Sequence, residues 1–235
     1  MKASKPLVII LIGPPGSGKG AQGELLSSHF NLYYLETSKV IEDVIMKAEP
    51  KDFLEIEGKK YFYLDERKRW ETGLLCSTPF VLHLLKQKVE RLAKMGENLI
   101  LSGSPRTLYE AERAIPELKD LYGKDNIKTI VFTLSSKESI SRNSHRRICE
   151  LMRHPILFNK ETEKLTLCPL DGSKLLKRKG LDDPKVIETR LKEYESLTVP
   201  VIEYLKKQGI ELTVLNGDQS VESLYKDILN TLKMQ

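Results

Sequence analysis

The stretch Gly13-Pro14-Pro15-Gly16-Ser17-Gly18-Lys19-Gly20 decides how this chain of 235 residues folds. An apolar run at residues 7–12, rich in branched side chains, precedes it, and such a run is typical of a strand buried on both faces. A helix is expected directly after the loop, over residues 18–30. A strand, a glycine-rich loop and a helix in this order bring backbone N–H groups and one lysine to phosphate oxygens. The stretch therefore predicts a site for the triphosphate of a nucleotide, with ATP as the first choice.

Outside this stretch, the sequence pattern predicts strands and helices in alternation. Strands are expected at residues 32–36, 98–101, 128–134 and 211–215. Helices are expected at residues 78–96, after a capping box formed by Ser135 and Glu138, at residues 184–208 with a kink at Pro200, and at residues 221–232. Such alternation produces a parallel sheet covered on both faces, so we predict an α/β fold. Residues 48–70 and 149–183 do not fit the alternation and are interpreted as inserted flaps.

The charge balance is mildly basic and has two interpretations. The chain has 38 Lys and Arg against 33 Asp and Glu, a net charge of +5. The excess could belong to a solvated surface, or to a site lined with arginine for a polyanion. Basic runs with aromatic residues among them are typical of nucleic-acid binders, and only residues 174–179 come near that pattern. Nucleic acid is therefore not an expected partner.

Cysteine usage and the N-terminal residues bear on the compartment. Cys76, Cys149 and Cys168 are an odd number at wide spacing, which argues against a disulfide framework and for a reducing compartment. The apolar run at residues 7–12 is too short for the core of a signal peptide or for a membrane span. We expect a soluble, cytoplasmic protein without a membrane partner.

Several ordered motifs extend over nearly the whole chain. Residues 13–22 match the pattern G-x-P-G-S-G-K-G-T-Q, with Ala21 in place of the threonine. Residues 73–76 are close to G-x-L-V, residues 101–107 to L-D-G-F-P-R-T, residues 142–148 to R-x-x-G-R-R-x, and residues 182–191 to D-D-x-x…R-L. Taken together, these motifs resemble those of the adenylate kinases, a family of nucleoside monophosphate kinases.

The resemblance implies an architecture and an activity. It implies a P-loop fold with a five-stranded parallel sheet, whose core comprises residues 1–37, 79–147 and 183–235. Residues 38–78 would form an acceptor flap that binds the nucleoside monophosphate, and residues 148–182 a lid. The implied enzyme is a monomer that transfers the γ-phosphoryl of ATP, bound with Mg²⁺, to a nucleoside monophosphate. AMP is the default acceptor.

The resemblance also implies roles for individual residues. Lys19, Arg106, Arg146 and Arg190 would be the catalytic cations. ATP would contact the loop and the end of one helix, at Gly16, Ser17, Gly18, Lys19, Gly20, Ala21, Arg142 and Arg146. Arg142 would stack on the donor base, because guanidinium planes stack well. The acceptor would contact Thr37, Leu74, Leu75, Cys76, Gly103, Arg106, Glu110 and Arg190.

The chain departs from the family pattern mainly in the acceptor half. Glu42 stands where the family has an arginine for the acceptor phosphate, and Lys39 and Lys47 are the candidates to replace that charge. Glu110 replaces a glutamine that reads adenine. A glutamate only accepts hydrogen bonds, so it would suit a guanine edge, unless it is merely a charge on a helix surface. On the magnesium side, Gly20 stands where phosphate loops in general have a Ser or Thr, and Ser102 stands where the family has an Asp. Gly180 replaces a lid arginine, for which Arg178 or Lys179 could substitute.

These departures leave two hypotheses open, a phosphotransferase and a catalytically weak ATP-binding relative with a regulatory or binding role. The lid raises a separate question about zinc. Its positions Cys149, Met152, Cys168 and Asp171 fall where some family members carry a four-ligand zinc site. Cys149, Cys168 and Asp171 could ligate zinc, but a thioether is a poor zinc ligand. Zinc is therefore possible in the lid but not expected.

Overall fold

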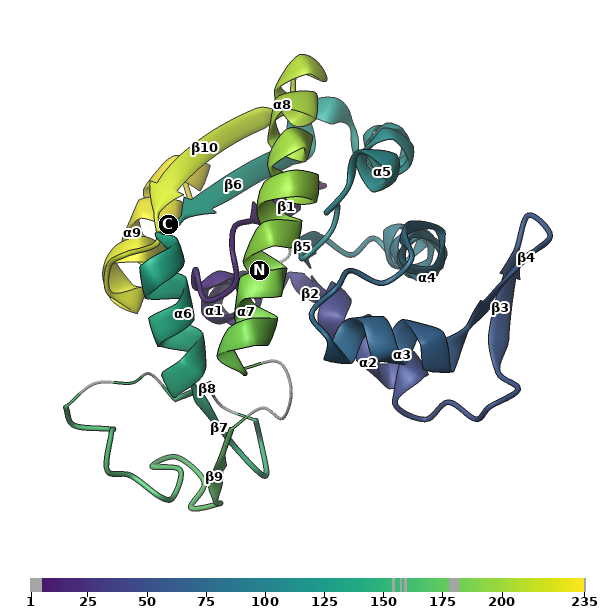
Figure 1. Ribbon diagram of the computed structural model, residues 1–235. Helices are drawn as coiled ribbons and strands as arrows, with labels where there is room; N and C mark the ends of the chain where they lie inside the picture. The colour runs from purple at the N-terminus through teal and green to yellow at the C-terminus, as the bar shows by residue number, and fades with distance from the viewer. Residues whose placement is uncertain (1–5, 154, 157, 159, 178–181, 235) are drawn as a thin grey trace.

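A five-stranded parallel sheet forms the centre of the computed structural model, which describes residues 6–153, 155–156, 158, 160–177 and 182–234. Its strand order is β10-β6-β1-β5-β2 (Figure 1). The strands are β1 (Val8–Ile12), β2 (Tyr33–Glu36), β5 (Leu99–Ser102), β6 (Ile127–Thr133) and β10 (Glu211–Asn216). All the pairings between them are parallel. The predicted α/β fold is confirmed, and each strand lies within one residue of its expected bounds.

Helices cover both faces of this sheet, which explains why β1 is apolar throughout. Val8, Ile10 and Ile12 belong to the core formed with α4 (Thr78–Lys94), α5 (Leu108–Tyr122) and α8 (Val199–Lys207). Ile9 and Leu11 belong to the opposite core, formed with α1 (Lys19–Phe30) and α9 (Val221–Leu232). Every β1 side chain is at most 3% exposed. Burial on both faces stabilises the strand from which the glycine-rich loop extends.

The acceptor flap joins β2 to α4 and contains elements that the sequence pattern did not resolve. It comprises most of α2 (Thr37–Ile45), the antiparallel hairpin of β3 (Phe53–Ile56) and β4 (Lys59–Phe62), and α3 (Tyr63–Glu71). Figure 1 shows the hairpin projecting away from the sheet. The flap returns to the core at residues 73–77, where Leu75 N–H donates to Glu193 Oε2 at 3.0 Å.

The lid is inserted between two helices that lie on the core. It continues from α6 (Ser136–His145) and leads back into α7 (Pro184–Glu193). Its three short antiparallel strands are β7 (Arg147–Cys149), β8 (Pro155–Ile156) and β9 (Leu175–Leu176). A short 3-10 helix, η1 (Lys124–Asn126), joins α5 to β6 in the core. In Figure 1 the lid lies at the bottom of the molecule and the hairpin of the acceptor flap at its right-hand side.

The expected single helix over residues 184–208 is divided in the structure. α7 ends at Glu193, a π-helical segment η2 (Tyr194–Thr198) follows, and α8 begins at Val199. Pro200 has no N–H to donate to the preceding turn, and the wider π turn accommodates that missing bond. Thr198 Oγ1 donates to the carbonyl of Arg106 at 3.0 Å. The interruption therefore braces the loop that follows β5.

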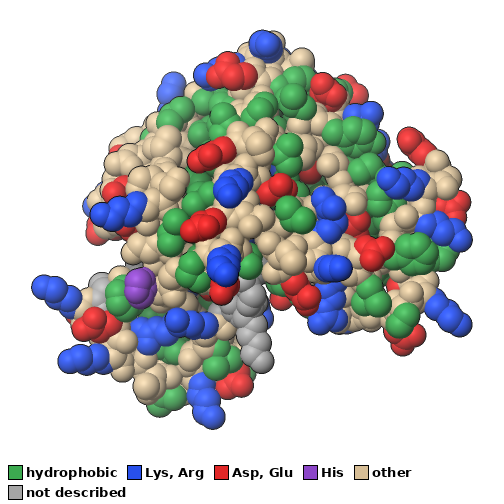
Figure 2. Space-filling model, in the orientation of Figure 1, with side chains coloured by type: hydrophobic (Ala, Val, Ile, Leu, Met, Phe, Trp, Pro, Cys, Tyr) green, Lys and Arg blue, Asp and Glu red, His purple; other side chains and the backbone are tan. Residues whose placement is uncertain are grey.

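The surface charge on one face of the molecule agrees with the first interpretation of the net charge, a solvated surface. On the face drawn in Figure 2, Lys and Arg lie among Asp and Glu and do not gather in one patch. Cys76, Cys149 and Cys168 all lie in the described part of the chain and form no disulfide. Within the described residues, none of the helices combines the length and the hydropathy that a membrane crossing requires.

Candidate active site

A cleft of about 1120 Å³ opens where several parallel strands end. The glycine-rich loop follows β1, Thr37 follows β2, and Gly103 follows β5, and residues of all three segments line the cleft. Parallel strands end at the same edge of a sheet, which is where open α/β folds bind ligands. The acceptor flap and the lid supply the remaining walls.

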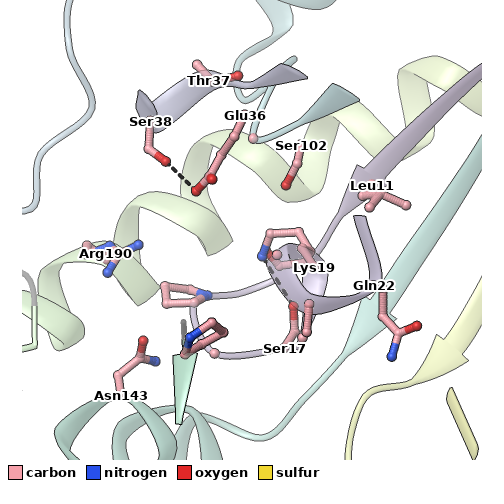
Figure 3. A pocket seen from close by; sticks show the side chains of 18 of the residues that line it. Leu11, Ser17, Lys19, Gln22, Glu36, Thr37, Ser38, Ser102, Asn143 and Arg190 are labelled. Carbon is pink, nitrogen blue, oxygen red and sulfur yellow. Dashed lines mark hydrogen bonds between the residues drawn. The ribbon is translucent and has the colours of Figure 1, made fainter. Parts of the chain in front are cut away.

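The glycine-rich loop forms a cradle that closes around the Lys19 ammonium. Gly16 and Gly18 have positive φ angles of 76° and 93°, and a Cβ at Gly16 would lie 2.6 Å from Asn143 Nδ2. Lys19 Nζ donates to the carbonyls of Gly13 and Pro14 at 2.6 and 2.8 Å, and to Ser17 Oγ at 3.2 Å (Figure 3). The N–H groups of Lys19, Gly20 and Ala21 belong to the first turn of α1. N–H groups in the first turn of a helix have no acceptor within the helix. This arrangement suits a polyphosphate.

Two residues of α6 brace the loop, and the sequence analysis missed both. Ser139 Oγ donates to the carbonyl of Pro15 at 2.6 Å, and Asn143 Nδ2 donates to the carbonyl of Ser139 at 2.7 Å. Both side chains are buried. Their spacing of four residues on α6, beside Arg142 and Arg146, was a signal that they share one helix face.

The predicted catalytic cations line the same cleft, although they come from different segments. The pKa of Lys19 is lowered well below its usual range, first by burial and then by the charges of Arg106, Arg190 and Arg146. Lys19 begins α1, Arg106 follows β5, Arg146 follows α6, and Arg190 lies on α7. Four like charges in one cleft disfavour one another, so the site is electrostatically suited to a polyanion.

The two arginines beside the lid are held by acidic partners. Arg146 pairs with the buried carboxylate of Asp182, Nη2 to Oδ1 at 2.5 Å. The Arg142 guanidinium donates to Glu138 Oε1 at 2.8 Å, to the carbonyl of Gly217 at 2.8 Å and to Asp218 Oδ1 at 2.9 Å. Three acceptors fix the plane of this guanidinium at the wall of the cleft, as a surface for stacking requires.

The predicted acceptor residues line the other half of the same cleft. Thr37 is buried at the start of α2. Gly103 has a φ angle of 87°, and a Cβ there would lie 2.6 Å from Arg106 Nη2. Leu74 is exposed, whereas Cys76 is buried and donates to the carbonyl of Glu66 at 3.5 Å. Burial raises the pKa of the Cys76 thiol to about 12, so this group lines the wall as a neutral thiol.

The interpretation of Glu110 as a charge on a helix surface is wrong. Glu110 lies on α5 but is only 3% exposed. Its Oε2 accepts hydrogen bonds from Ser104 Oγ and from the backbone N–H of Arg106, both at 2.9 Å. Burial raises the pKa of Glu110, and these two hydrogen bonds oppose the shift. The carboxylate therefore fixes the loop that carries Arg106, a role that the sequence alone did not indicate.

The departures at the acceptor phosphate have structural consequences. Glu42 pairs with Arg153 of the lid, Oε1 to Nη2 at 3.7 Å. Lys39 lies at 3.3 Å from Glu36 and 3.7 Å from Glu24, and Lys47 is exposed and does not line the cleft. Lys39 therefore lines the cleft beside two carboxylates, whereas Lys47 lies outside it. Gly180, Arg178 and Lys179 lie outside the described residues.

The lid brings together three of the four residues that were considered for zinc. Donor atoms of Cys149, Cys168 and Asp171 all lie within 4.8 Å of one another. Cys149 Sγ donates to Asp171 Oδ2 at 3.0 Å, and Asp171 Oδ1 accepts from Ser173. Met152, at the fourth position, is 63% exposed. The described residues therefore supply three donors, one fewer than a closed structural zinc site requires.

Comparison with known proteins gives a consistent result over most of the chain. The family model for adenylate kinase matches residues 11–210. An adenylate kinase of Petrotoga mobilis is 31% identical over 96% of this chain and 97% of its own length. An adenylate kinase of Acetivibrio thermocellus is also 31% identical, over 95% and 97%. One of Methanocella arvoryzae is 30% identical, over 93% and 95%.

Proposed function

This chain belongs to the adenylate kinase family, and from that premise we propose that it transfers the γ-phosphoryl of ATP to a nucleoside monophosphate. One observation carries the proposal: Lys19, Arg106, Arg146 and Arg190 line a single cleft, and the three arginine charges act on Lys19 in its glycine-rich cradle. AMP is the default acceptor because of the family. All the described walls of the cleft come from one chain, so we propose a monomer that takes part in nucleotide biosynthesis.

The proposed reaction needs alignment and positive charge more than covalent chemistry. An oxygen of the acceptor's α-phosphate attacks the γ-phosphorus of ATP, and the bond from that phosphorus to the β–γ bridging oxygen breaks. The products are ADP and the diphosphate of the acceptor. Lys19 and the loop amides hold the donor phosphates, Arg106 holds the acceptor phosphate, and Arg146 and Arg190 neutralise the transferred group. The magnesium ion enters as part of the MgATP substrate.

A panel of monophosphates tests the proposal. Purified protein is incubated with MgATP and, separately, with AMP, GMP, CMP, UMP and their deoxy forms, and diphosphate formation is followed by ³¹P NMR. We expect diphosphate with at least one acceptor, at a rate far above that of a Lys19→Met variant. If no acceptor gives more diphosphate than that variant, the chain is not a monophosphate kinase.

A second candidate, a catalytically weak ATP-binding protein, is favoured by one specific feature. Glu42 places a carboxylate in the acceptor half of the cleft, where its pairing with Arg153 joins the flap to the lid. This candidate predicts ATP binding by calorimetry together with no diphosphate in the panel. Rapid turnover with any monophosphate would exclude it.

Glu110 gives a prediction about the acceptor base. A glutamine amide can donate a hydrogen bond to adenine N1, whereas an ionised glutamate can only accept from the N–H groups of guanine. Glu110→Gln is therefore expected to shift the ratio of kcat/KM for AMP over GMP upward by roughly fivefold, the equivalent of about 1 kcal/mol for one hydrogen bond. The amide oxygen can still accept from Ser104 and Arg106.

The matched control for this prediction is Glu117→Gln, because Glu117 lies on the same helix and pairs with Lys86 at 3.3 Å. We expect the control to leave the AMP/GMP ratio unchanged. An active Glu110→Gln variant with an unchanged ratio would remove Glu110 from base recognition and leave it only the role of supporting the loop.

We propose that the lid holds its shape without zinc. The Cys149–Asp171 and Asp171–Ser173 hydrogen bonds already satisfy the carboxylate, and Met152 is exposed. The purified protein is expected to contain far less than one zinc per chain by plasma mass spectrometry. Its Tm is expected to be the same with and without a chelator. Stoichiometric zinc, or a large fall of Tm on chelation, would contradict this proposal.

A further inference from the structure

MgATP needs a carboxylate near its magnesium ion, and the expected positions do not supply one. Magnesium in nucleotide sites keeps several waters and is held by one or two carboxylates together with the substrate phosphates. The residue after Lys19 is Gly20, which has no hydroxyl, and the residue at the end of β5 is Ser102, which has no carboxylate. A carboxylate elsewhere in the cleft would therefore have to supply the charge.

Three of the carboxylates around the cleft are bonded to the arginines or the loops of the site itself. In the described part of the chain, those that line it are Glu24, Glu36, Glu42, Glu110 and Glu138. Glu42 faces Arg153 of the lid, Glu110 accepts from the loop that carries Arg106, and Glu138 is bonded to Arg142. The side chain of Glu24 is half-exposed. Glu36 is left, and its charge acts on the Lys19 ammonium of the phosphate loop.

The strand register places Glu36 directly beside the expected position. Glu36 is the last residue of β2, and its Cα pairs with that of Ser102 at the end of β5. The two strands are parallel, so both residues lie at the same edge of the sheet, which is the edge where the glycine-rich loop begins. Figure 3 shows Glu36, Ser102 and Lys19 around the same space. The Glu36 charge acts on Lys19, since it raises the lysine pKa while the three arginines lower it.

The contacts of Glu36 hold its carboxylate in place and leave it able to accept more. Ser38 Oγ donates to Oε1 at 2.7 Å, and Lys39 Nζ lies 3.3 Å from Oε2. An ionised carboxylate offers about four lone-pair sites, so two partners do not saturate it. The side chain is 26% exposed, which leaves room for ordered water at its surface.

We propose that Glu36 orders the water shell of the magnesium ion in MgATP, so that the acidic group has moved from β5 to the neighbouring strand β2. This inference rests on the proposed function, because it assumes that MgATP binds at the loop. Glu36 acts on the metal through water and is a positioning residue. The Ser102 hydroxyl, on the neighbouring strand, is polar but carries no charge.

The test measures how strongly magnesium improves the binding of ATP. Calorimetric ATP affinities are recorded at increasing free Mg²⁺ for the wild type, Glu36→Gln, and the double variant Glu36→Gln/Ser102→Asp. Loss of a group that orients metal-bound water typically costs about 10- to 100-fold in metal affinity. We expect Glu36→Gln to lose the magnesium enhancement by about that factor while it binds metal-free ATP as the wild type does. The double variant should regain it, because the carboxylate returns across the same strand pair.

Glu24→Gln is the matched control, since Glu24 is the other carboxylate beside Lys39, at 3.7 Å. It should keep the full magnesium enhancement, which separates the metal role of Glu36 from its pairing with Lys39. An undiminished enhancement in Glu36→Gln, or a double variant no better than Glu36→Gln, overturns the inference while ATP binding and the proposed function stand. A wild type that binds no ATP at any Mg²⁺ concentration overturns both.

Discussion

Lys19→Met is expected to lower kcat/KM for phosphoryl transfer by about a thousandfold, the loss that follows removal of one preorganised charge from a transition state. The Lys19 ammonium is held by Gly13, Pro14 and Ser17 at 2.6–3.2 Å, so it is positioned before substrate arrives. Methionine keeps the length of the side chain and removes the charge. The rate is measured in a coupled assay with the best acceptor of the panel.

The same variant should remain folded. The pKa of Lys19 is lowered in the folded protein, which means that the charged form is disfavoured there relative to the unfolded chain. A neutral side chain removes that cost, so no large fall of Tm is expected. Lys39→Met is the control, because it also removes a lysine charge from the cleft wall and should cost far less activity. A Lys19→Met variant that keeps most of the wild-type kcat/KM would show that the cradle is not the donor site.

Arg146→Ala is expected to lower kcat on the order of a thousandfold, as removal of an arginine from a transferring phosphoryl does. Arg146 lies at the end of α6, faces the cleft and acts on the Lys19 ammonium. Its guanidinium pairs with Asp182, so the variant also leaves a buried carboxylate without that partner. A lower Tm is therefore expected. Rates are compared at a temperature below the unfolding transitions of both the wild type and the variant.

Arg147→Ala provides the matched control for Arg146. The neighbouring guanidinium bonds to the carbonyls of Leu165 and Thr162 within the lid. Its loss removes the same charge one residue away, and we expect a much smaller effect on kcat. Equal losses in the two variants would mean that Arg146 acts on lid structure and not on the transferred phosphoryl.

The sequence pattern predicted the elements whose burial can be recognised from their own residues. β1 is apolar at every position because both faces are covered. A strand, a glycine-rich loop and a helix in this order are typical of a phosphate site. The helix α5 was not among the predicted elements, and Pro116 lies inside it. Its buried residues Ala111, Ile115, Leu118 and Tyr122 nevertheless recur at helical spacing, and this periodicity was the available signal.

The parts that could not be predicted depend on contacts between distant segments. Glu110 is buried because the Ser104–Arg106 loop folds over its carboxylate, and nothing in the local sequence of α5 requires that. The pairing of Glu36 with Ser102 depends on the register of β2 against β5. The pairing of Glu42 with Arg153 depends on where the lid lies. Sequence motifs located the site, whereas the charges in its acceptor half could be placed only by the fold.

The central claim is that one cleft holds a donor triphosphate and an acceptor phosphate end to end. A calorimetric titration with dinucleoside pentaphosphates, in which five phosphates join two nucleosides, tests it most directly. Because the second nucleoside would then bind as part of the same molecule, such a compound should bind much more tightly than ATP alone. Lys19→Met should weaken it strongly. Binding no tighter than that of ATP, for the adenosine–adenosine and the adenosine–guanosine compound alike, would contradict the account.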